Sequence, residues 1–168
     1  MSDRARIQGA VAALHGHATV RVELDDDDAA PGLVFFAFEL DGGGDAGVYG
    51  SGIMAGDEVL VGFDRAGPTI ARALAGTSDA AVLARAFGVL ETECDTARAL
   101  VAADQLADVP ADSKAYVGLP TLVDGPDARV LTYWCESGEP PLFRSTVTIE
   151  KSGKVTRQRK DIWSFLQS

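Results

Sequence analysis

The sequence has few of the residues that most often carry catalysis or metal binding. It contains 2 cysteines and 2 histidines among 168 residues. Cys94 and Cys135 form no C-x-x-C pair and no zinc-ligand spacing, and we interpret both as buried free thiols, with a disulfide between them as the alternative. No G-x-S-x-G, H-E-x-x-H or recognisable triad is present. The sequence therefore predicts no catalytic residues and no metal site, and it favours a protein that is not an enzyme.

Long uncharged stretches are missing as well. The longest one, Ile7–Val20, spans fourteen residues, which is too few for a helix to cross a bilayer. The spacing of Ile7, Val11 and Leu14 indicates one face of an amphipathic helix rather than the compact apolar segment of a secretory leader. We therefore expect a cytoplasmic protein with no membrane partner.

Basic residues are scarce outside the C-terminal quarter. Residues 1–128 carry eight basic and twenty-one acidic side chains, whereas residues 129–168 carry seven basic and four acidic ones. Five of those seven lie within ten positions, at Lys151, Lys154, Arg157, Arg159 and Lys160. An acidic chain repels nucleic acid unless one face is strongly basic, so nucleic acid is not the expected partner. The basic run is either a contact surface or a solvated edge strand whose charges block unwanted pairing.

A β-meander pattern occurs twice, over residues 33–63 and 129–160. In each copy apolar strands alternate with short turns rich in glycine, aspartate or proline. Val34–Leu40 is apolar on both faces, which is typical of a central strand covered on both sides. The sequence predicts an α+β fold with two antiparallel meanders of three to four strands each, separated by a long helical segment. We expect a single domain, with pseudo-repeated halves at 1–66 and 110–168 as a further possibility, joined by helices at 68–107.

Capping residues and proline indicate where the outer helices begin and end. Ser2 is a suitable N-cap for a first helix that ends near Gly16. Pro68 is suited to the first turn of a helix ending at Gly76. Asp161 can cap a short C-terminal helix, whose apolar side chains we expect to dock on the body or on a partner.

The middle of the chain carries a continuous apolar stripe from Leu83 to Val101. Because this stripe stays on one helical face through Gly88, we predict one long helix from about Asp79 to Leu106. A capping box at 92–95, which would restart the helix there, is the alternative. A strand over about 114–123 is expected to follow.

Three motifs suggest ligands but have simpler interpretations. Gly42–Gly47 matches G-x-G-x-x-G, yet a strand pattern follows it rather than the helix that a dinucleotide site needs, so we interpret it as a hairpin loop. Asp25–Asp28 lacks the spacing of a calcium loop and is interpreted as a solvated acidic loop. His15 and His17 have no third ligand in view. No cofactor is predicted.

Aromatic residues gather beside the basic run. Interleaved aromatic and basic side chains can bind nucleic acid or form a protein contact surface. The alternative is a set of core aromatic residues next to a soluble edge strand. The predicted partner-binding residues are Tyr133, Trp134, Arg144, Arg157, Arg159, Lys160 and Trp163.

The order of elements resembles the small α+β proteins of the YbjN and type III secretion chaperone kind. The likeness is carried by the Ser2–Leu14 helix, the 33–63 meander, the Asp79–Leu106 helix and the 129–160 sheet. The resemblance implies a non-enzymatic protein that binds another protein, often as a dimer. We therefore expect a protein-binding module such as a chaperone, an immunity-type inhibitor or an adaptor. The alternatives are a structural subunit of a larger assembly and an enzyme with an unrecognised site near His15, His17 or Cys135.

Overall fold

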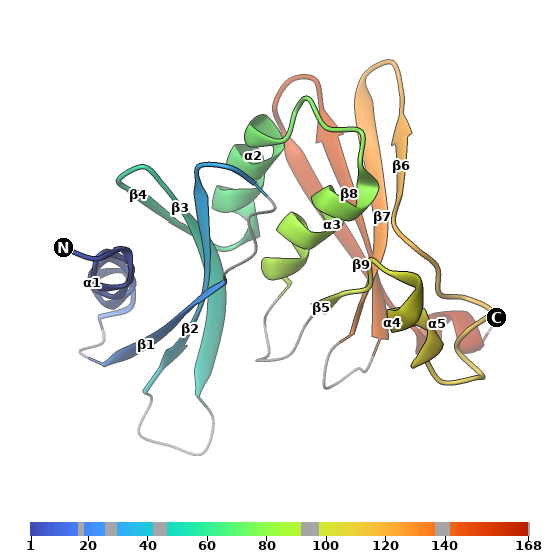
Figure 1. Ribbon diagram of the computed structural model, residues 1–168, viewed down its shortest axis with the longest axis horizontal. Coiled ribbons are helices and arrows are strands. Elements are labelled where there is room, and N and C mark those ends of the chain that lie inside the picture. The colour runs from blue at the N-terminus through green and yellow to red at the C-terminus, as the bar shows by residue number, and fades with distance from the viewer. Residues whose placement is uncertain (17–18, 26–29, 42–46, 92–97, 137–141, 168) are drawn as a thin grey trace.

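Two antiparallel sheets and five helices make up the part of the chain that the structure describes. The computed structural model describes residues 1–16, 19–25, 30–41, 47–91, 98–136 and 142–167. Figure 1 shows the two sheets side by side, with helices between them and on their outer sides. The predicted α+β class is confirmed, as are the two meanders, the N-terminal helix and the short C-terminal helix.

Sheet A is the first predicted meander. Its strands are β1 (Val20–Asp25), β2 (Leu33–Leu40), β3 (Val48–Ala55) and β4 (Glu58–Val61), paired in that order. The register places Gly50 of β3 opposite Phe38 of β2, and Gly52 opposite Phe36. A Cβ atom at either glycine would overlap the facing ring. The small residues of β3 therefore make room for the large rings of β2.

Helix α1 (Asp3–His15) covers the outer face of sheet A. Its ends are as predicted, because Ser2 Oγ accepts a hydrogen bond from the Ala5 amide and Gly16 adopts a φ of 67°. Ile7 and Val11 are fully buried against Phe36, Phe38 and Leu40 of β2. Leu14 was predicted on the same apolar face, but its side chain is exposed.

Sheet B contains the second predicted meander. Its strands are β5 (Arg98–Ala99), β6 (Thr121–Asp124), β7 (Ala128–Glu136), β8 (Leu142–Glu150) and β9 (Val155–Asp161). The order is β5-β7-β8-β9, and β6 also pairs with β7. The strand predicted over 114–123 is shorter than expected. Ser113 and Lys114 both donate backbone hydrogen bonds to the Pro110 carbonyl, so the chain turns there before β6 begins.

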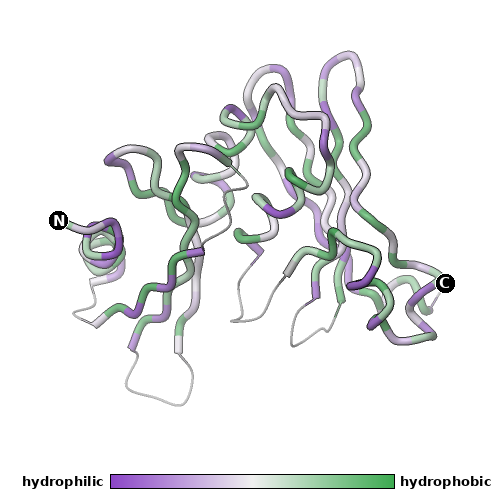
Figure 2. Tube along the Cα trace, in the orientation of Figure 1, coloured by the Kyte–Doolittle hydropathy of each residue, from purple (hydrophilic) through white to green (hydrophobic). Residues whose placement is uncertain are grey.

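A single core joins the two sheets. Helices α2 (Phe63–Ala73) and α3 (Ala80–Val89) lie between them (Figure 1). Phe35 of sheet A, Phe87 of α3 and Leu131 of sheet B belong to the same buried cluster. In Figure 2 hydrophobic stretches follow the strands of both sheets and α3. Both faces of β2 are thus covered, one by α1 and the other by this shared core.

The predicted long helix over Asp79–Leu106 is wrong. Asp79 caps α3 as expected, but the helix ends at Val89, and the amides of Leu90 and Glu91 close a turn on Phe87 and Gly88. Residues 92–97, which include Cys94 and the alternative capping box, lie outside the described part. The chain then returns as β5 and as the short helix α4 (Ala103–Ala107). A helical apolar stripe cannot distinguish a straight helix from a chain that folds back.

The position predicted for Pro68 is also wrong. Helix α2 begins at Phe63, after Gly62 with a φ of 81°, so Pro68 lies inside the helix rather than in its first turn. The proline lacks the N–H that would bond the Asp64 carbonyl. The buried side chains of Phe63, Ala66 and Ile70 stabilise the turn that precedes the proline.

The C-terminus docks on the outer face of sheet B, as the sequence predicts. Helix α5 (Trp163–Leu166) follows β9 directly. Ile162 is fully buried in a third cluster, against which Phe165 and Leu166 pack. Two details differ from the expectation. Asp161 belongs to β9, with Ile162 in the N-cap position, and Trp163 is 54% exposed.

Among the described residues, no helix is both long and apolar enough to span a membrane.

Candidate partner-binding site

Six of the seven predicted contact residues lie on two opposite faces of sheet B, because side chains alternate along each strand, and the seventh, Trp163, begins α5. Tyr133, Arg157 and Arg159 lie on the inner face, toward α3. Trp134, Arg144 and Lys160 lie on the outer face in one cross-strand row. The prediction of one contiguous surface therefore divides into a buried network and an outer cluster.

The inner face holds a buried network around Glu91, whose side chain is 0% exposed. Its Oε1 atom accepts hydrogen bonds from Tyr133 Oη at 2.7 Å and from Ser145 Oγ at 2.6 Å. Its Oε2 atom accepts one from Arg157 Nη1 at 2.9 Å, and Arg159 Nε lies 3.5 Å away. Both carboxylate oxygens are thus satisfied, and two guanidinium groups compensate the buried charge.

Burial and the negative charge of Glu91 favour the protonated forms of Tyr133 and Cys135. Burial raises the pKa of Tyr133 well above 10.0, and the negative charge of Glu91 raises it further. The same two causes raise the pKa of the Cys135 thiol well above 9.0. Cys135 is a buried free thiol, as predicted. It stays protonated at neutral pH and cannot act as a thiolate nucleophile.

The three inner-face residues therefore bind Glu91 inside the protein: Tyr133, Arg157 and Arg159. The guanidinium of Arg157 lies 4.5 Å from the Phe63 ring centroid, and that of Arg159 lies 4.0 Å from the Phe143 ring centroid. Sequence reasoning missed Glu91. The available signal was a single carboxylate directly after the apolar end of α3.

The outer face carries a cluster built on Phe165 of α5. The Arg144 guanidinium lies 4.6 Å from the Phe165 ring centroid, and Lys160 Nζ lies 4.3 Å from it. Trp134 and Tyr116 contact the same ring, with centroid distances of 5.4 and 6.4 Å. We call these five residues the Phe165 cluster. Sequence reasoning found three of them and missed Phe165 and Tyr116.

The two cations of the Phe165 cluster are not neutralised. Arg144 and Lys160 are directly opposite each other on β8 and β9, where like charges repel. Within the described ranges neither forms an ion pair. Tyr116 is 44% exposed and Trp163, three residues after Lys160, is 54% exposed. This arrangement can bind a carboxylate while aromatic surface lies beside it.

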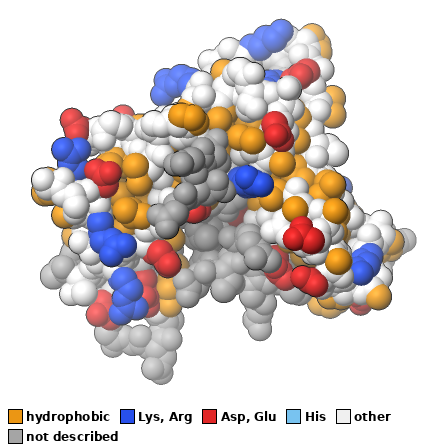
Figure 3. Space-filling model, in the orientation of Figure 1, with side chains coloured by type: hydrophobic (Ala, Val, Ile, Leu, Met, Phe, Trp, Pro, Cys, Tyr) orange, Lys and Arg blue, Asp and Glu red, His pale blue; other side chains and the backbone are white. Residues whose placement is uncertain are grey.

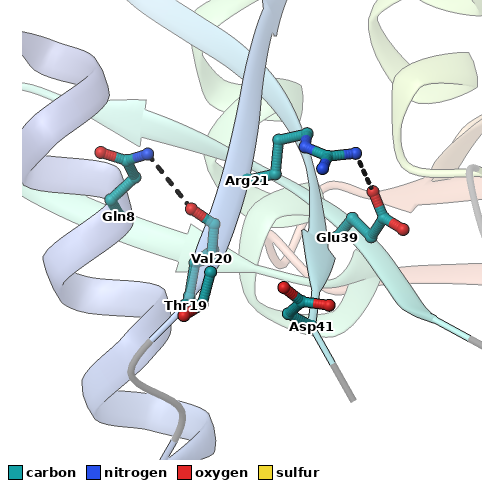
Figure 4. A pocket seen from close by; sticks show the side chains of 6 residues that line it. All are labelled: Gln8, Thr19, Val20, Arg21, Glu39 and Asp41. Carbon is teal, nitrogen blue, oxygen red and sulfur yellow. Dashed lines mark hydrogen bonds and ion pairs between the residues drawn. The ribbon is translucent and has the colours of Figure 1, made fainter. Parts of the chain in front are cut away.

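A concave region lies between α1 and sheet A. This hollow of about 240 Å³ is lined by Gln8, Thr19, Val20, Arg21, Glu39 and Asp41 (Figure 4). Its Arg21 and Glu39 pair with each other at 2.9 Å, and Gln8 Nε2 donates to the Val20 carbonyl. Three of its polar groups are therefore already engaged, which leaves little for a ligand to bind.

The described part of the chain shows no metal-binding group. No group of three or more His, Cys, Asp or Glu side chains within the described ranges is placed to hold a metal ion. The His15 ring packs 5.6 Å from that of Phe38. His17, most of the acidic run at 25–28 and most of the glycine loop at 42–47 lie outside the described part. On the face seen in Figure 3, acidic and basic side chains are interspersed.

Comparisons with known proteins do not add to this geometry. No protein-family model matches the chain, and neither a curated protein nor a solved structure was found to match it.

Proposed function

We propose that the protein is a non-catalytic module that binds an acidic segment of another protein through the Phe165 cluster. One observation carries the proposal. Arg144 and Lys160 flank a single aromatic ring, and neither forms an ion pair with any residue that the structure describes. Chaperone, immunity-type inhibitor and adaptor roles are all compatible with such binding, within the cytoplasmic location expected from the sequence.

The charge distribution favours an acidic partner at this place. The chain has a net charge of −10, so most of its surface repels an acidic protein. Residues 129–168, which supply Arg144 and Lys160, carry seven basic and four acidic side chains. Such asymmetry orients an approaching partner and raises its association rate, and salt weakens both effects.

Aromatic surface beside the cations can supply the affinity that exposed charges alone do not. Exposed ion pairs contribute about 0–1 kcal/mol each. Tryptophan, tyrosine and arginine are the residues that most often dominate protein interfaces. Tyr116 contacts the Phe165 ring on which Arg144 stacks, and it is exposed, as is Trp163 at the start of α5. A partner side chain can bury against this aromatic surface while its carboxylate meets the cations.

Affinity capture with a matched pair of variants tests the proposal. The site variant combines Lys160→Glu with Trp163→Ala, and the control combines Arg4→Glu with Leu14→Ala on α1. The two variants change the net charge equally, and Trp163 and Leu14 are both 54% exposed. The wild type and both variants, tagged in the native cell, are captured and the bound proteins are quantified by mass spectrometry.

We expect an acidic protein that the wild type and the control capture equally and that the site variant captures at least tenfold less. Raising the salt concentration should weaken the capture, because the attraction is screened. Equal capture by all three proteins, or equal loss in both variants, would contradict the proposal.

A further inference from the structure

Part of the outer face of sheet B is open and uncharged. Helices α4 and α5 cover only one end of this face (Figure 1). Between the row of Arg144 and the row of Glu150, the outward-facing side chains come from β6, β7, β8 and β9. We call them the threonine face: Thr121, Val123, Val130, Thr132, Thr146, Thr148, Thr156 and Gln158. All eight are half-buried or exposed, and Val123 is 63% exposed.

The absence of charge from this face is unusual for the chain. Charged residues make up 24% of the sequence, and the solvated face of an antiparallel sheet is ordinarily polar. The eight side chains of the threonine face carry no formal charge, and most are β-branched. Such a face can pack against another flat surface without leaving an unpaired charge between them.

We propose that the threonine face is the interface of a two-fold symmetric dimer of this chain. Beyond the buried Leu142, the outward-facing residues of β8 read Arg144, Thr146, Thr148 and Glu150, so a cation and a carboxylate flank the two threonines. A two-fold axis that reverses the strand direction places Arg144 over Glu150 of the second copy and Glu150 over its Arg144. This charge pattern is complementary to itself under that rotation.

The covered end of the sheet selects the same rotation independently. In the other face-to-face arrangement, with the axis parallel to the strands, the α4 and α5 regions of both copies would occupy the same end and collide. Reversing the strand direction instead places each covered end beyond the bare end of the other sheet. The steric and electrostatic arguments therefore lead to the same axis.

The remaining rows are also complementary to themselves. With the axis passing over Val147 of β8, Thr146 faces Thr148 of the second copy, and Val130 faces its Thr132. On β6, Thr121 faces Val123 in the same way. Methyl groups therefore meet across the axis, while threonine hydroxyls remain able to bond one another or water.

The dimer is expected to be weak. Strands lie about 4.8 Å apart and rise about 3.4 Å per residue, so the face measures about 14 by 20 Å. The area of the face is therefore well below the roughly 800 Å² that each partner buries in a standard interface. Lys160 of the edge strand β9 would approach Lys154 of the second copy, which precedes that strand, at the rim, where solvent screens their repulsion. Dissociation constants in the micromolar range or above follow.

The dimer goes beyond the proposed function but shares Arg144 with it. In the dimer Arg144 meets Glu150 of the second copy, so a second copy and an acidic partner compete for the same guanidinium. Glu150 lies at the opposite end of β8 and is not part of the Phe165 cluster. Substitutions at Glu150 and at Lys160 therefore separate the two proposals.

Charge exchange across the axis tests the dimer by analytical ultracentrifugation over a range of protein concentrations. The variants are Arg144→Glu, Glu150→Arg and the double exchange, with Glu58→Arg on β4 as a control for the charge change. Glu58 is exposed on sheet A. Circular dichroism verifies that each variant is folded.

We expect the wild type and E58R to dimerise alike. R144E and E150R should each raise the dissociation constant at least tenfold, and the double exchange should recover most of that loss. A wild type that stays monomeric at 0.5 mM, or single variants that dimerise as the wild type does, would overturn the dimer. A double exchange no better than the single variants would also overturn it.

The outcome for partner binding is distinguishable from the outcome for the dimer. If both proposals hold, E150R is monomeric yet captures the acidic partner at least as well as the wild type. The K160E/W163A variant loses the partner but still dimerises. Retained dimerisation with no partner captured by any variant would contradict the proposed function alone.

Discussion

Arg157 on the edge strand β9 donates a hydrogen bond from Nη1 to Oε2 of Glu91 at 2.9 Å. The same nitrogen donates to the Leu90 carbonyl at 3.3 Å, so one side chain joins β9 to the chain that leaves α3. Glu91 is 0% exposed and Arg157 is 17% exposed. A pair this deeply buried contributes little over a well-packed apolar pair, but removing one partner leaves a buried charge without compensation.

Replacing Glu91 with glutamine should therefore destabilise the fold strongly. Two guanidinium groups would lose their counter-charge, and we expect the free energy of unfolding to fall by about 3–5 kcal/mol. Urea denaturation followed by circular dichroism measures the change. The control is Asp57→Asn, which breaks the surface pair with Arg6, where Asp57 is 91% exposed. That loss should stay within about 1 kcal/mol, and equal losses at both sites would show that the Glu91 network is not structural.

Alkaline pH should destabilise the protein through Tyr133 and Cys135. Their pKa values are raised from 10.0 and 9.0 in the folded state, so the unfolded chain releases both protons at lower pH. The free energy of unfolding then falls as pH rises above 9, by about 1.4 kcal/mol per pH unit for each such group. The stability that these groups contribute is fully present below their unfolded pKa values.

Variants separate the contributions of Tyr133 and Cys135 through the slope of the free energy of unfolding against pH, rather than through its absolute value. We expect Cys135→Ala to flatten the pH dependence above 9 and Tyr133→Phe to flatten it above 10. Urea denaturation at half-unit steps from pH 7 to 11 gives the slopes. Curves that run parallel to the wild type in both variants would show that neither group stays protonated in the folded state.

Local patterns in the sequence predicted much of the fold. Period-two alternation and turn residues located the strands of both meanders, and Ser2 and Gly16 located α1, because these signals act between near neighbours. The prediction of one long helix was wrong because of contacts with residues far away in the sequence. The apolar stripe continues past Gly88, but α3 ends at Val89, and Glu91 bonds to buried partners from β7, β8 and β9.

The candidate site was predicted in composition but not in arrangement. Clustering in sequence placed Tyr133 beside Trp134 and Arg159 beside Lys160, yet neighbours on a strand face opposite sides of the sheet. Only pairing register shows that Trp134, Arg144 and Lys160 share one row. Phe165 joins that row because α5 docks on the sheet; the apolar side chains of α5 predicted the docking but not the row that Phe165 reaches.

Two glycines in helices should respond to alanine in opposite directions. A Cβ atom at Gly88 of α3 would lie 2.8 Å from the Ala99 Cβ on β5, whereas one at Gly9 of α1 meets nothing within 4 Å. Gly88→Ala forces α3 and β5 apart, and overpacking of this kind costs about 1–3 kcal/mol. Gly9→Ala should stabilise the protein by about 0.5–1 kcal/mol. Urea midpoints that move the same way in both variants would contradict the close approach.

Neighbouring residues at the C-terminus should differ sharply in their effect on stability. Ile162 is 1% exposed in the cluster that holds Trp134, and Trp163 is 54% exposed. Ile162→Ala removes buried methyl groups and leaves a cavity, so the free energy of unfolding should fall by about 2–5 kcal/mol. Trp163→Ala should change it by no more than about 0.5 kcal/mol.

Fluorescence can follow the same cluster directly, because the chain has 2 tryptophans. In a Trp163→Ala background the emission comes from Trp134 alone, which is 4% exposed beneath Phe165. Adding Ile162→Ala should shift this emission to longer wavelength at urea concentrations where the circular dichroism of the sheets is unchanged, because α5 detaches before sheet B unfolds. If emission and circular dichroism change together at every urea concentration, α5 and sheet B form one cooperative unit, and the C-terminal cluster cannot open separately.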